Sequence, residues 1–291
     1  MKIRIATCQF PVTSDIRSNL SYVKRQMKAA RDKGADLAHF SECCLGGYAG
    51  VDLPSLEGYD WDLLQRSARE VTELARELGL WVILGSNHRL SGGHLPHNSL
   101  YLIDPQGRVV DRYDKRFCTG SRTQVQDDLS HYSPGNRFVV FEVNSVRCGI
   151  QICHDFRYPE LYREYKRREV QLMFHSYHNG GMTLEHKRKY HDVWKVLVLA
   201  TMQTYAASNY MWISVNNTTR RHSSGSSFVV QPDGLIAGRL PLHRAGVLIS
   251  TIDTEAPFYD ASREWRSRAM RGVFHSGTPV DDLRSKDRTC L

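Results

Sequence analysis

One cysteine stands where a nucleophile would be displayed. A strand-like run over residues 149–152 leads into Cys153, and Pro159 suits the first position of a helix. The sharp turn expected between strand and helix presents the thiol, and backbone N–H groups of the turn, especially that of His154, can point at an oxyanion. The positive end of the following helix favours a thiolate. The segment therefore predicts a reactive cysteine, and the competing interpretation is a structural cysteine at a strand end.

A thiol of ordinary pKa, about 8.5, is a poor nucleophile at neutral pH until a base removes its proton. Glu42 is the stronger candidate for this base because it follows a short predicted strand and precedes a glycine turn. His154 is the weaker candidate, since adjacent side chains after a strand diverge. Lys115 also follows a predicted strand, and a fixed ammonium there would stabilise the negative charge of a tetrahedral intermediate. Taken singly, neither Glu42 nor Lys115 is a specific signal.

The elements that position these residues are short apolar strands alternating with amphipathic helices, without a low-complexity linker. This alternation predicts an α/β fold in one domain, residues 1–260, followed by a basic tail, residues 261–291. Glu42, Lys115 and Cys153 each come after a predicted strand, and ligands of open α/β sheets bind at the carboxyl ends of strands. We therefore expect the three side chains to converge.

The pattern predicts four main helices: one capped by Ser14 or Ser18 and stopped by Gly34, one over 61–78, one from 159, and a long one ending near 208. Strands are expected at 3–8, 37–40, 80–85, 100–103, 109–110, 138–143, 146–152, 170–174, 210–215, 226–231 and 246–252.

Composition restricts the class of protein. Seven cysteines, an odd number, without a signal-peptide pattern predict reduced thiols and a cytoplasmic protein. No apolar run approaches the roughly 18 residues of a membrane span, so no membrane partner is expected. The net charge of +8 comes from basic residues scattered over helices and tail without interleaved aromatic residues, which argues against a nucleic-acid partner.

Histidines near the cysteine could suggest a metal site. His175 and His178 have a two-ligand spacing, but neither a cysteine pair nor an HExxH pattern accompanies them, so we expect no metal. His175, Tyr177 and His178 follow a predicted strand. Together with Tyr48, which lies near Glu42, they are expected to line a substrate pocket.

The segments of Glu42, Lys115 and Cys153 together resemble those of the nitrilase superfamily, the carbon-nitrogen hydrolases, in pattern and chain order. The resemblance covers nearly the whole chain and is closest at residues 98–99, 113–115, 133–135 and around the cysteine. Cys153-x-Asp155 is similar to the amidase branches, whereas true nitrilases usually carry Trp-Glu after the cysteine. The resemblance implies a four-layer α-β-β-α sandwich and hydrolysis of a small, non-peptide amide or N-carbamoyl compound.

The mechanism that the resemblance implies is covalent and uses no cofactor. Glu42 takes the Cys153 proton, Lys115 and the His154 N–H hold the oxyanion, and water activated by Glu42 hydrolyses the thioester. Many members carry a second glutamate where this chain has Asp128, which is expected to orient Lys115 or the substrate amide. Asp127 takes that role if the loop shifts by one residue.

The resemblance also implies a substrate charge and an assembly. Omega-amidases and N-carbamoyl amino acid hydrolases carry an arginine at the place of Arg157, so Arg157 is expected to grip a substrate carboxylate. The alternative is a surface arginine paired with Glu160 or Asp155. A homodimer or larger homo-oligomer is expected, with the tail packing on a partner subunit. Other functions left open are a catalytically silent binding protein on the same fold, a nitrilase, and a papain-like thiol protease.

Overall fold

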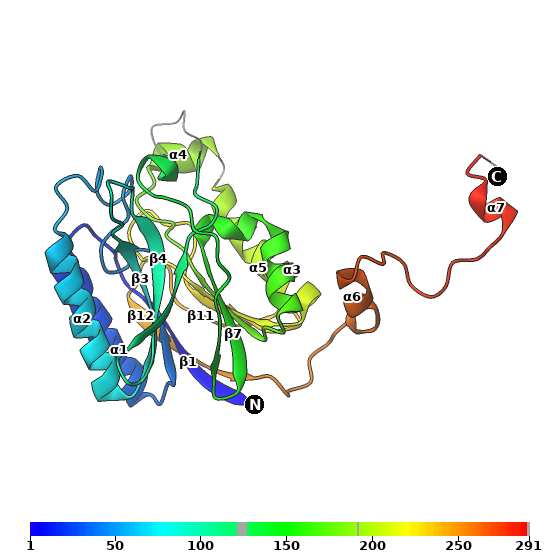
Figure 1. Cartoon of the computed structure of the whole chain (residues 1–291), viewed down its shortest axis with the longest axis horizontal. Helices are drawn as coiled ribbons and strands as arrows, with labels where there is room; N and C mark the ends of the chain where they lie inside the picture. Colours follow the sequence, from blue (N-terminus) through cyan, green and yellow to red (C-terminus); the bar gives the residue numbers. More distant parts are fainter. Residues whose placement is uncertain (121–126, 191, 290–291) are drawn as a thin grey trace.

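Two six-stranded sheets stack face to face, and helices cover the outer face of each sheet (Figure 1). The computed structural model describes residues 1–120, 127–190 and 192–289. The first sheet has the order β12-β1-β2-β3-β4-β5, and the second has the order β11-β10-β9-β8-β7-β6. The α-β-β-α sandwich implied by the resemblance is thus confirmed.

The strands of the first sheet are β1 (Lys2–Gln9), β2 (Leu37–His39), β3 (Trp81–His88), β4 (His97–Ile103), β5 (Val109–Asp114) and β12 (Gly246–Asp253). The strands of the second sheet are β6 (Val140–Val143), β7 (Val146–Ile152), β8 (Leu172–Ser176), β9 (Trp212–Asn216), β10 (Phe228–Val230) and β11 (Ile236–Arg239). The first sheet is completed late in the chain, because β12 pairs antiparallel with β1 along all eight residues of each strand.

The outer layers are helices. The helices α1 (Ile16–Asp32) and α2 (Trp61–Leu78) cover the first sheet, and α3 (Pro159–Arg167) and α5 (Val193–Asn209) cover the second. In α1 the predicted apolar face is buried: Leu20, Val23, Met27 and Ala30. In the part of the chain that the structure describes, no helix combines the length and apolar character needed to cross a membrane.

The sequence prediction of the first helix start was wrong by one residue. Asp15 caps α1, and its carboxylate accepts hydrogen bonds from the backbone N–H groups of Arg17 and Ser18. The predicted caps were Ser14 or Ser18, but Ser18 lies inside the first turn. A charged acceptor at the positive end of the helix satisfies two free N–H groups at once, which explains why Asp15 takes this place.

A polar network crosses the otherwise apolar interface between the sheets. His39 Nδ1 lies 2.9 Å from Ser214 Oγ, and His39 Nε2 lies 2.9 Å from Ser176 Oγ. Burial lowers the pKa of His39 well below its usual range, so the ring is neutral and both nitrogens are satisfied. Ser176 Oγ in turn donates to the carbonyl of Phe40 over 2.7 Å. The network therefore ties the end of β2 to the end of β8, next to the loops that carry the site.

The chain beyond β12 leaves the body of the molecule and carries two short helices, α6 (Arg263–Met270) and α7 (Leu283–Lys286) (Figure 1). Arg266 Nε donates to the carbonyl of Ser208 over 3.1 Å, which anchors α6 on the end of α5. Further along, Phe274 and Leu283 are exposed. Apart from the tail and the two 3-10 helices, Asp128–Ser130 and Cys153–Arg157, the elements that the sequence prediction missed in the described part of the chain are β11 and the short helix α4 (Leu184–Lys189). β11 is an exposed edge strand without apolar alternation.

Candidate active site

The expected convergence at the strand ends is present. Lys115 directly follows β5, Cys153 directly follows β7, and Glu42 lies three residues after β2. Lys115 Nζ donates to Glu42 Oε1 over 2.9 Å and to Asp128 Oδ2 over 2.7 Å. These three charged side chains are buried, which makes their mutual interaction strong.

Lys115 is held as a buried ammonium. Burial lowers the pKa of Lys115, but the carboxylates of Asp128 and Glu42 raise it well above its usual value. The Nζ atom also donates to Tyr48 OH over 3.0 Å, and Tyr48 OH donates to Asp128 Oδ1 over 2.6 Å. The ammonium is therefore fixed in position by its contacts with two carboxylates and a phenol.

Asp128 was expected to stand where many relatives carry a second glutamate. Its carboxylate contacts the ammonium of Lys115. Besides Lys115 and Tyr48, Asp128 accepts the backbone N–H of Thr119 over 2.8 Å. Asp127 has another contact, since its carboxylate accepts the N–H of Leu129 and caps the 3-10 helix Asp128–Ser130. The shorter aspartate reaches Lys115 without a shift of the loop.

Glu42 has one fixed and one free oxygen. Its Oε1 accepts hydrogen bonds from Lys115 and, over 2.7 Å, from Asn98 Nδ2. Among the described residues, Oε2 has no hydrogen-bond partner although it is buried. Gly85 on β3 makes this placement possible, because a Cβ there would collide with the carbonyl oxygen of Ser41 and lie 2.8 Å from the nitrogen of Cys43. The free oxygen is available to take a proton.

Cys153 starts a tight 3-10 turn, Cys153–Arg157, before Pro159 opens α3. Its φ of 42° is unusual for a residue with a side chain, and such strain persists only where the surroundings enforce it. Burial and the charge of Glu42 raise the pKa of the Cys153 thiol, whereas Lys115 and the backbone N–H of His178 oppose this shift. The resting sulfur is therefore a thiol that needs a base.

Asp155 enforces the turn. Its buried carboxylate accepts Tyr113 OH over 2.7 Å, the N–H of Phe117 over 2.8 Å and the N–H of Ile152 over 3.1 Å. Burial raises the pKa of Asp155 to about 6. Since Tyr113 and Phe117 flank Lys115, this one carboxylate joins the segment of the cation to the turn of the nucleophile.

Cys153 lines a cavity of about 270 Å³. Four of the five predicted substrate-binding residues line it with Cys153: Tyr48, His175, Tyr177 and His178. His175 is neutral, because burial lowers its pKa to about 3, and its Nδ1 lies 3.2 Å from Tyr162 OH. The N–H of His154, expected in the oxyanion site, belongs to the same 3-10 turn as Cys153.

Arg157 is placed differently from the other predicted substrate-binding residues. Its side chain is exposed and does not line the cavity. The guanidinium carbon lies 4.7 Å from the ring centre of Trp194 and 5.0 Å from that of Phe156, and both rings line the cavity. Within the described residues, it forms no ion pair with Glu160 or Asp155, the alternative that the sequence left open. Arg157 thus lies at the edge of the cavity.

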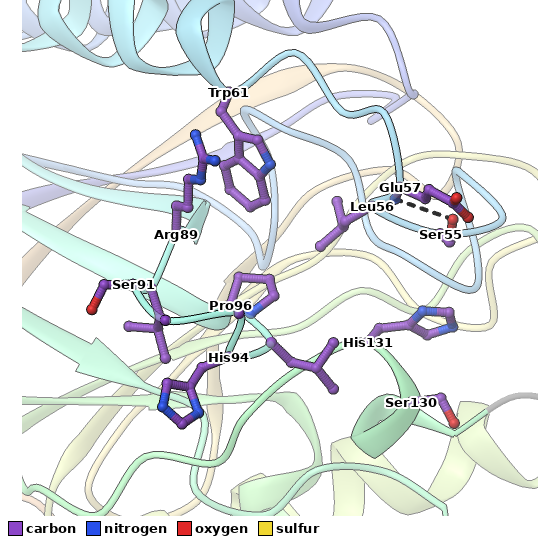
Figure 2. Close-up of a pocket in the computed structure, with 14 residues that line it drawn as sticks. Ser55, Leu56, Glu57, Trp61, Arg89, Ser91, His94, Pro96, Ser130 and His131 are labelled. Atoms are coloured by element: carbon purple, nitrogen blue, oxygen red, sulfur yellow. Dashed lines mark hydrogen bonds between the residues drawn. The ribbon is translucent and has the colours of Figure 1, made fainter.

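A second cavity has a volume of about 680 Å³ (Figure 2). It is lined by Trp61, Arg89 and His94 among others, and Figure 2 shows the Arg89 guanidinium next to the Trp61 ring. His131 lines both cavities. Cys153 does not line this second cavity, so the space beside the thiol is the smaller one.

Sequence reasoning missed two residues, Asp52 and Arg220, that lie next to His178 of the Cys153 cavity. Asp52 is buried, with Oδ2 3.0 Å from His178 Nε2, and its Oδ1 pairs with the guanidinium of Arg220. Asp52 follows a glycine-rich stretch and Arg220 belongs to a basic pair, patterns that are typical of solvated loops. Neither segment contains a local signal that could have predicted this pairing.

Comparison with known proteins gives the class of the chain. Residues 4–256 match the family model of the carbon-nitrogen hydrolases. The chain therefore belongs to the carbon-nitrogen hydrolase family, as the sequence resemblance implied. It is a hydrolase of carbon-nitrogen bonds other than peptide bonds.

Within the family, the chain is similar to several amidases. It is 24% identical to the human omega-amidase over 86% of this chain and 88% of that protein. The omega-amidase of Xenopus tropicalis is 29% identical over 59% of this chain, and the match spans 62% of that protein. The N-carbamoylputrescine amidase of Solanum tuberosum is 23% identical over 87% of each chain.

Solved structures share the fold. An amidase of the nitrilase superfamily from Nesterenkonia, solved as a cysteine-to-alanine variant, has a TM-score of 0.73, 21% identity, and coverage of 94% of this chain and 97% of that chain. A glutamate-to-glutamine variant of the Nesterenkonia amidase carries the acetamide moiety of fluoroacetamide covalently at its active-site cysteine, and it has a TM-score of 0.73 at 20% identity. At this identity the likeness shows the fold.

Proposed function

We propose that the chain is an amidase in which Cys153 is the nucleophile, Glu42 the general base and Lys115 the fixed cation. The observation that carries the proposal is the Lys115 ammonium, which lies between the carboxylates of Glu42 and Asp128 next to a thiol that lines a small cavity. This arrangement supplies the three groups that acyl transfer through sulfur requires.

In the first half-reaction, the free oxygen of Glu42 takes the Cys153 proton while the sulfur attacks the amide carbonyl carbon. The carbonyl oxygen becomes an oxyanion, stabilised by Lys115 and by the backbone N–H of His154. When the C–N bond breaks, the leaving nitrogen receives the proton from Glu42 and departs as ammonia or an amine. A thioester remains on Cys153.

In the second half-reaction, a water molecule gives a proton to Glu42 and attacks the thioester carbon. The carbon-sulfur bond then breaks, the sulfur regains the proton, and the product leaves as a carboxylic acid. Asp128 and Tyr48 act as positioning residues, since they hold the ammonium of Lys115 in place through both halves. Two half-reactions that need the same proton acceptor are thus served by one carboxylate.

The substrate that we propose is small and bears a carboxylate. The cavity of about 270 Å³ is small for a ligand site. Arg157 lies at its edge, where a guanidinium can pair with a carboxylate through two parallel hydrogen bonds. The names of the related amidases, with omega-amide and N-carbamoyl substrates, agree with a compact amide or ureido compound.

Covalent labelling of the nucleophile tests this function. In the Glu42→Gln variant, the Cys153 sulfur is expected to displace fluoride from fluoroacetamide and keep the acetamide moiety as a thioether, and peptide mapping should place this added mass on Cys153. The matched control is Cys118→Ala, which removes another thiol near the site and should leave the adduct and wild-type turnover intact. An adduct on another cysteine, or none on a folded Glu42→Gln variant, would refute the assignment.

We also infer a homo-oligomer in a reducing compartment such as the cytoplasm. The exposed fractions of Phe274 and Leu283 in the tail are 86% and 82%, and such apolar side chains gain by being covered by a partner. Six cysteines from Cys8 to Cys153 are free thiols, which suits a reducing environment.

A further inference from the structure

A second buried ion-pair cluster adjoins the catalytic cavity. Asp52 comes from the loop after Glu42, His178 from the loop after β8, and Arg220 from the loop after β9. The Asp52 carboxylate lies between the other two, with Oδ2 3.0 Å from His178 Nε2 and Oδ1 paired with Arg220 Nη1. The side chains of Asp52 and His178 are fully buried, while that of Arg220 is 34% exposed.

The cluster holds a positive charge at the cavity wall. Burial lowers the pKa of His178, but the Asp52 carboxylate raises it by more, so the pKa of His178 lies above its usual value. Asp52 is kept ionised by His178, by the N–H of Tyr48 over 2.9 Å and by Arg220, although burial opposes this. When His178 is protonated, one anion lies between two cations, and the cluster is then positively charged.

His178 also has a spare donor. An imidazolium carries an N–H on each ring nitrogen, and only Nε2 faces Asp52. Both ring nitrogens are buried, and neither forms a hydrogen bond within the described residues; Nε2 contacts Asp52 as an ion pair, whereas Nδ1 has no charged partner there. His178 lines the cavity of Cys153. A buried N–H without an acceptor is costly, so a ligand that supplies an acceptor gains affinity there.

The anionic side chains around the cavity affect where a substrate carboxylate can lie. Asp128 and Glu42 are neutralised in part by Lys115, whereas Asp127 also lines the cavity and has no cation partner within the described residues. A substrate carboxylate is therefore repelled by Asp127 and attracted by His178. Arg157 is exposed at the cavity edge, so it can contact a carboxylate from outside the cavity, whereas His178 can contact it from inside.

We propose that His178 determines specificity by donating from Nδ1 to a carboxylate oxygen on the acyl part of the substrate, with Asp52 and Arg220 as positioning residues. This inference rests on the proposed amidase function and names the group that its cavity recognises. Asp52 fixes the ring through Nε2, and Arg220 fixes Asp52. The carboxylate then lies toward the loop after β8, and the scissile amide lies at Cys153.

The test compares two amides of the same length, succinamate and its neutral counterpart 4-oxopentanamide. For His178→Gln, kcat/KM for succinamate is expected to fall about ten- to a hundredfold, mainly through a higher KM, because a charge-assisted hydrogen bond is lost. The value for 4-oxopentanamide should change less than about threefold. The control His94→Gln alters an exposed histidine of the second cavity and should change neither.

Asp52→Asn keeps the His178 ring and removes the anion behind it, so it is also expected to raise the KM for succinamate selectively. This variant decides the matter if His178→Gln does not fold. Equal losses on both amides in Asp52→Asn, or in a folded His178→Gln, would overturn the role of His178 and leave the amidase proposal standing. Absence of the fluoroacetamide adduct from Cys153 in a folded Glu42→Gln variant, together with no ammonia release by wild type from either amide, would instead overturn the amidase proposal itself.

Discussion

Tyr113, the next to last residue of β5 in the first sheet, donates its hydroxyl to Asp155, in the turn that follows β7 of the second sheet, over 2.7 Å. Lys115 lies two residues after Tyr113, and Cys153 lies two residues before Asp155. The bond therefore spans the two sheets at the point where the cation and the nucleophile must be aligned.

Removal of this bond should affect the rate. Tyr113→Phe leaves a buried carboxylate with one donor fewer, which costs about 1–3 kcal/mol. We expect kcat to fall about tenfold, because misplacement of reacting groups by a fraction of an ångström is expensive. Ammonia release and thermal unfolding of the purified variant measure the two effects. An unchanged kcat in a folded variant would show that the bond does not align the site.

The nucleophile and the base are tested by single substitutions. Cys153→Ala should abolish turnover while the protein stays folded, and Glu42→Gln should lower the rate about a hundredfold or more, because the thiol then has no proton acceptor. Steady-state kinetics and circular dichroism check both. Near-normal activity of either purified variant would exclude the assigned role.

Asp128 and Asp127 form a matched pair one residue apart. Asp128→Asn removes one of the two anions that hold Lys115, so it should depress kcat far more than Asp127→Asn, which alters a helix cap. Rates of both variants, measured side by side, decide this prediction. Equal and mild effects would mean that Asp128 is only a buried structural carboxylate.

The pH dependence of unfolding adds a second measurement at Asp128. Burial raises its pKa, but Lys115 lowers it more, so the folded pKa lies below the ordinary value of about 3.9. A lowered carboxyl pKa stabilises the folded protein above the unfolded pKa, and this contribution is lost as pH falls through the folded pKa. The stability difference between wild type and Asp128→Asn should therefore shrink below about pH 4.

A substitution at Arg157 distinguishes the effect of its positive charge from the effect of the guanidinium geometry. Arg157→Lys keeps the positive charge but loses the two-pronged fork, so kcat/KM for a carboxylated amide is expected to fall about ten- to a hundredfold. The matching neutral amide should lose little. A wild type that prefers the neutral amide, or a variant that treats both alike, would contradict the role of Arg157.

Assembly is measured by light scattering. A homo-oligomer should give at least twice the subunit mass of 33.4 kDa at micromolar concentration. Phe274→Asp combined with Leu283→Asp should shift the mass toward one subunit, because a charge opposes burial of these positions. A wild type that remains at 33.4 kDa would refute the oligomer.

The sequence predicted what depends on local pattern. The helix Trp61–Leu78 and the strand Val146–Ile152 were predicted with the bounds that the structure has, because apolar spacing and turn residues delimit them. Glu42, Lys115 and Cys153 each follow a predicted strand, and strand ends meet at one edge of a sheet, but it was the resemblance to the carbon-nitrogen hydrolases that selected the three together.

Features that depend on contacts between distant loops were not predictable. Asp52, His178 and Arg220 come from three separate loops, so nothing near any one of them indicates an ion pair. The contact of the Arg157 guanidinium with the Trp194 ring was missed for a similar reason, since Trp194 belongs to another helix. Local sequence specifies which group is present, and tertiary packing decides what it faces.

The pairing of β1 with β12 has a consequence for protein synthesis. Lys2 of β1 pairs with Asp253 of β12, so the first sheet is complete only when β12, the last strand of the chain, has paired with β1. A nascent chain on the ribosome carries its thiol at residue 153 long before β12 has been translated. Because β12 is the edge strand beside β1, the first sheet gains this strand only after residue 253 has been translated.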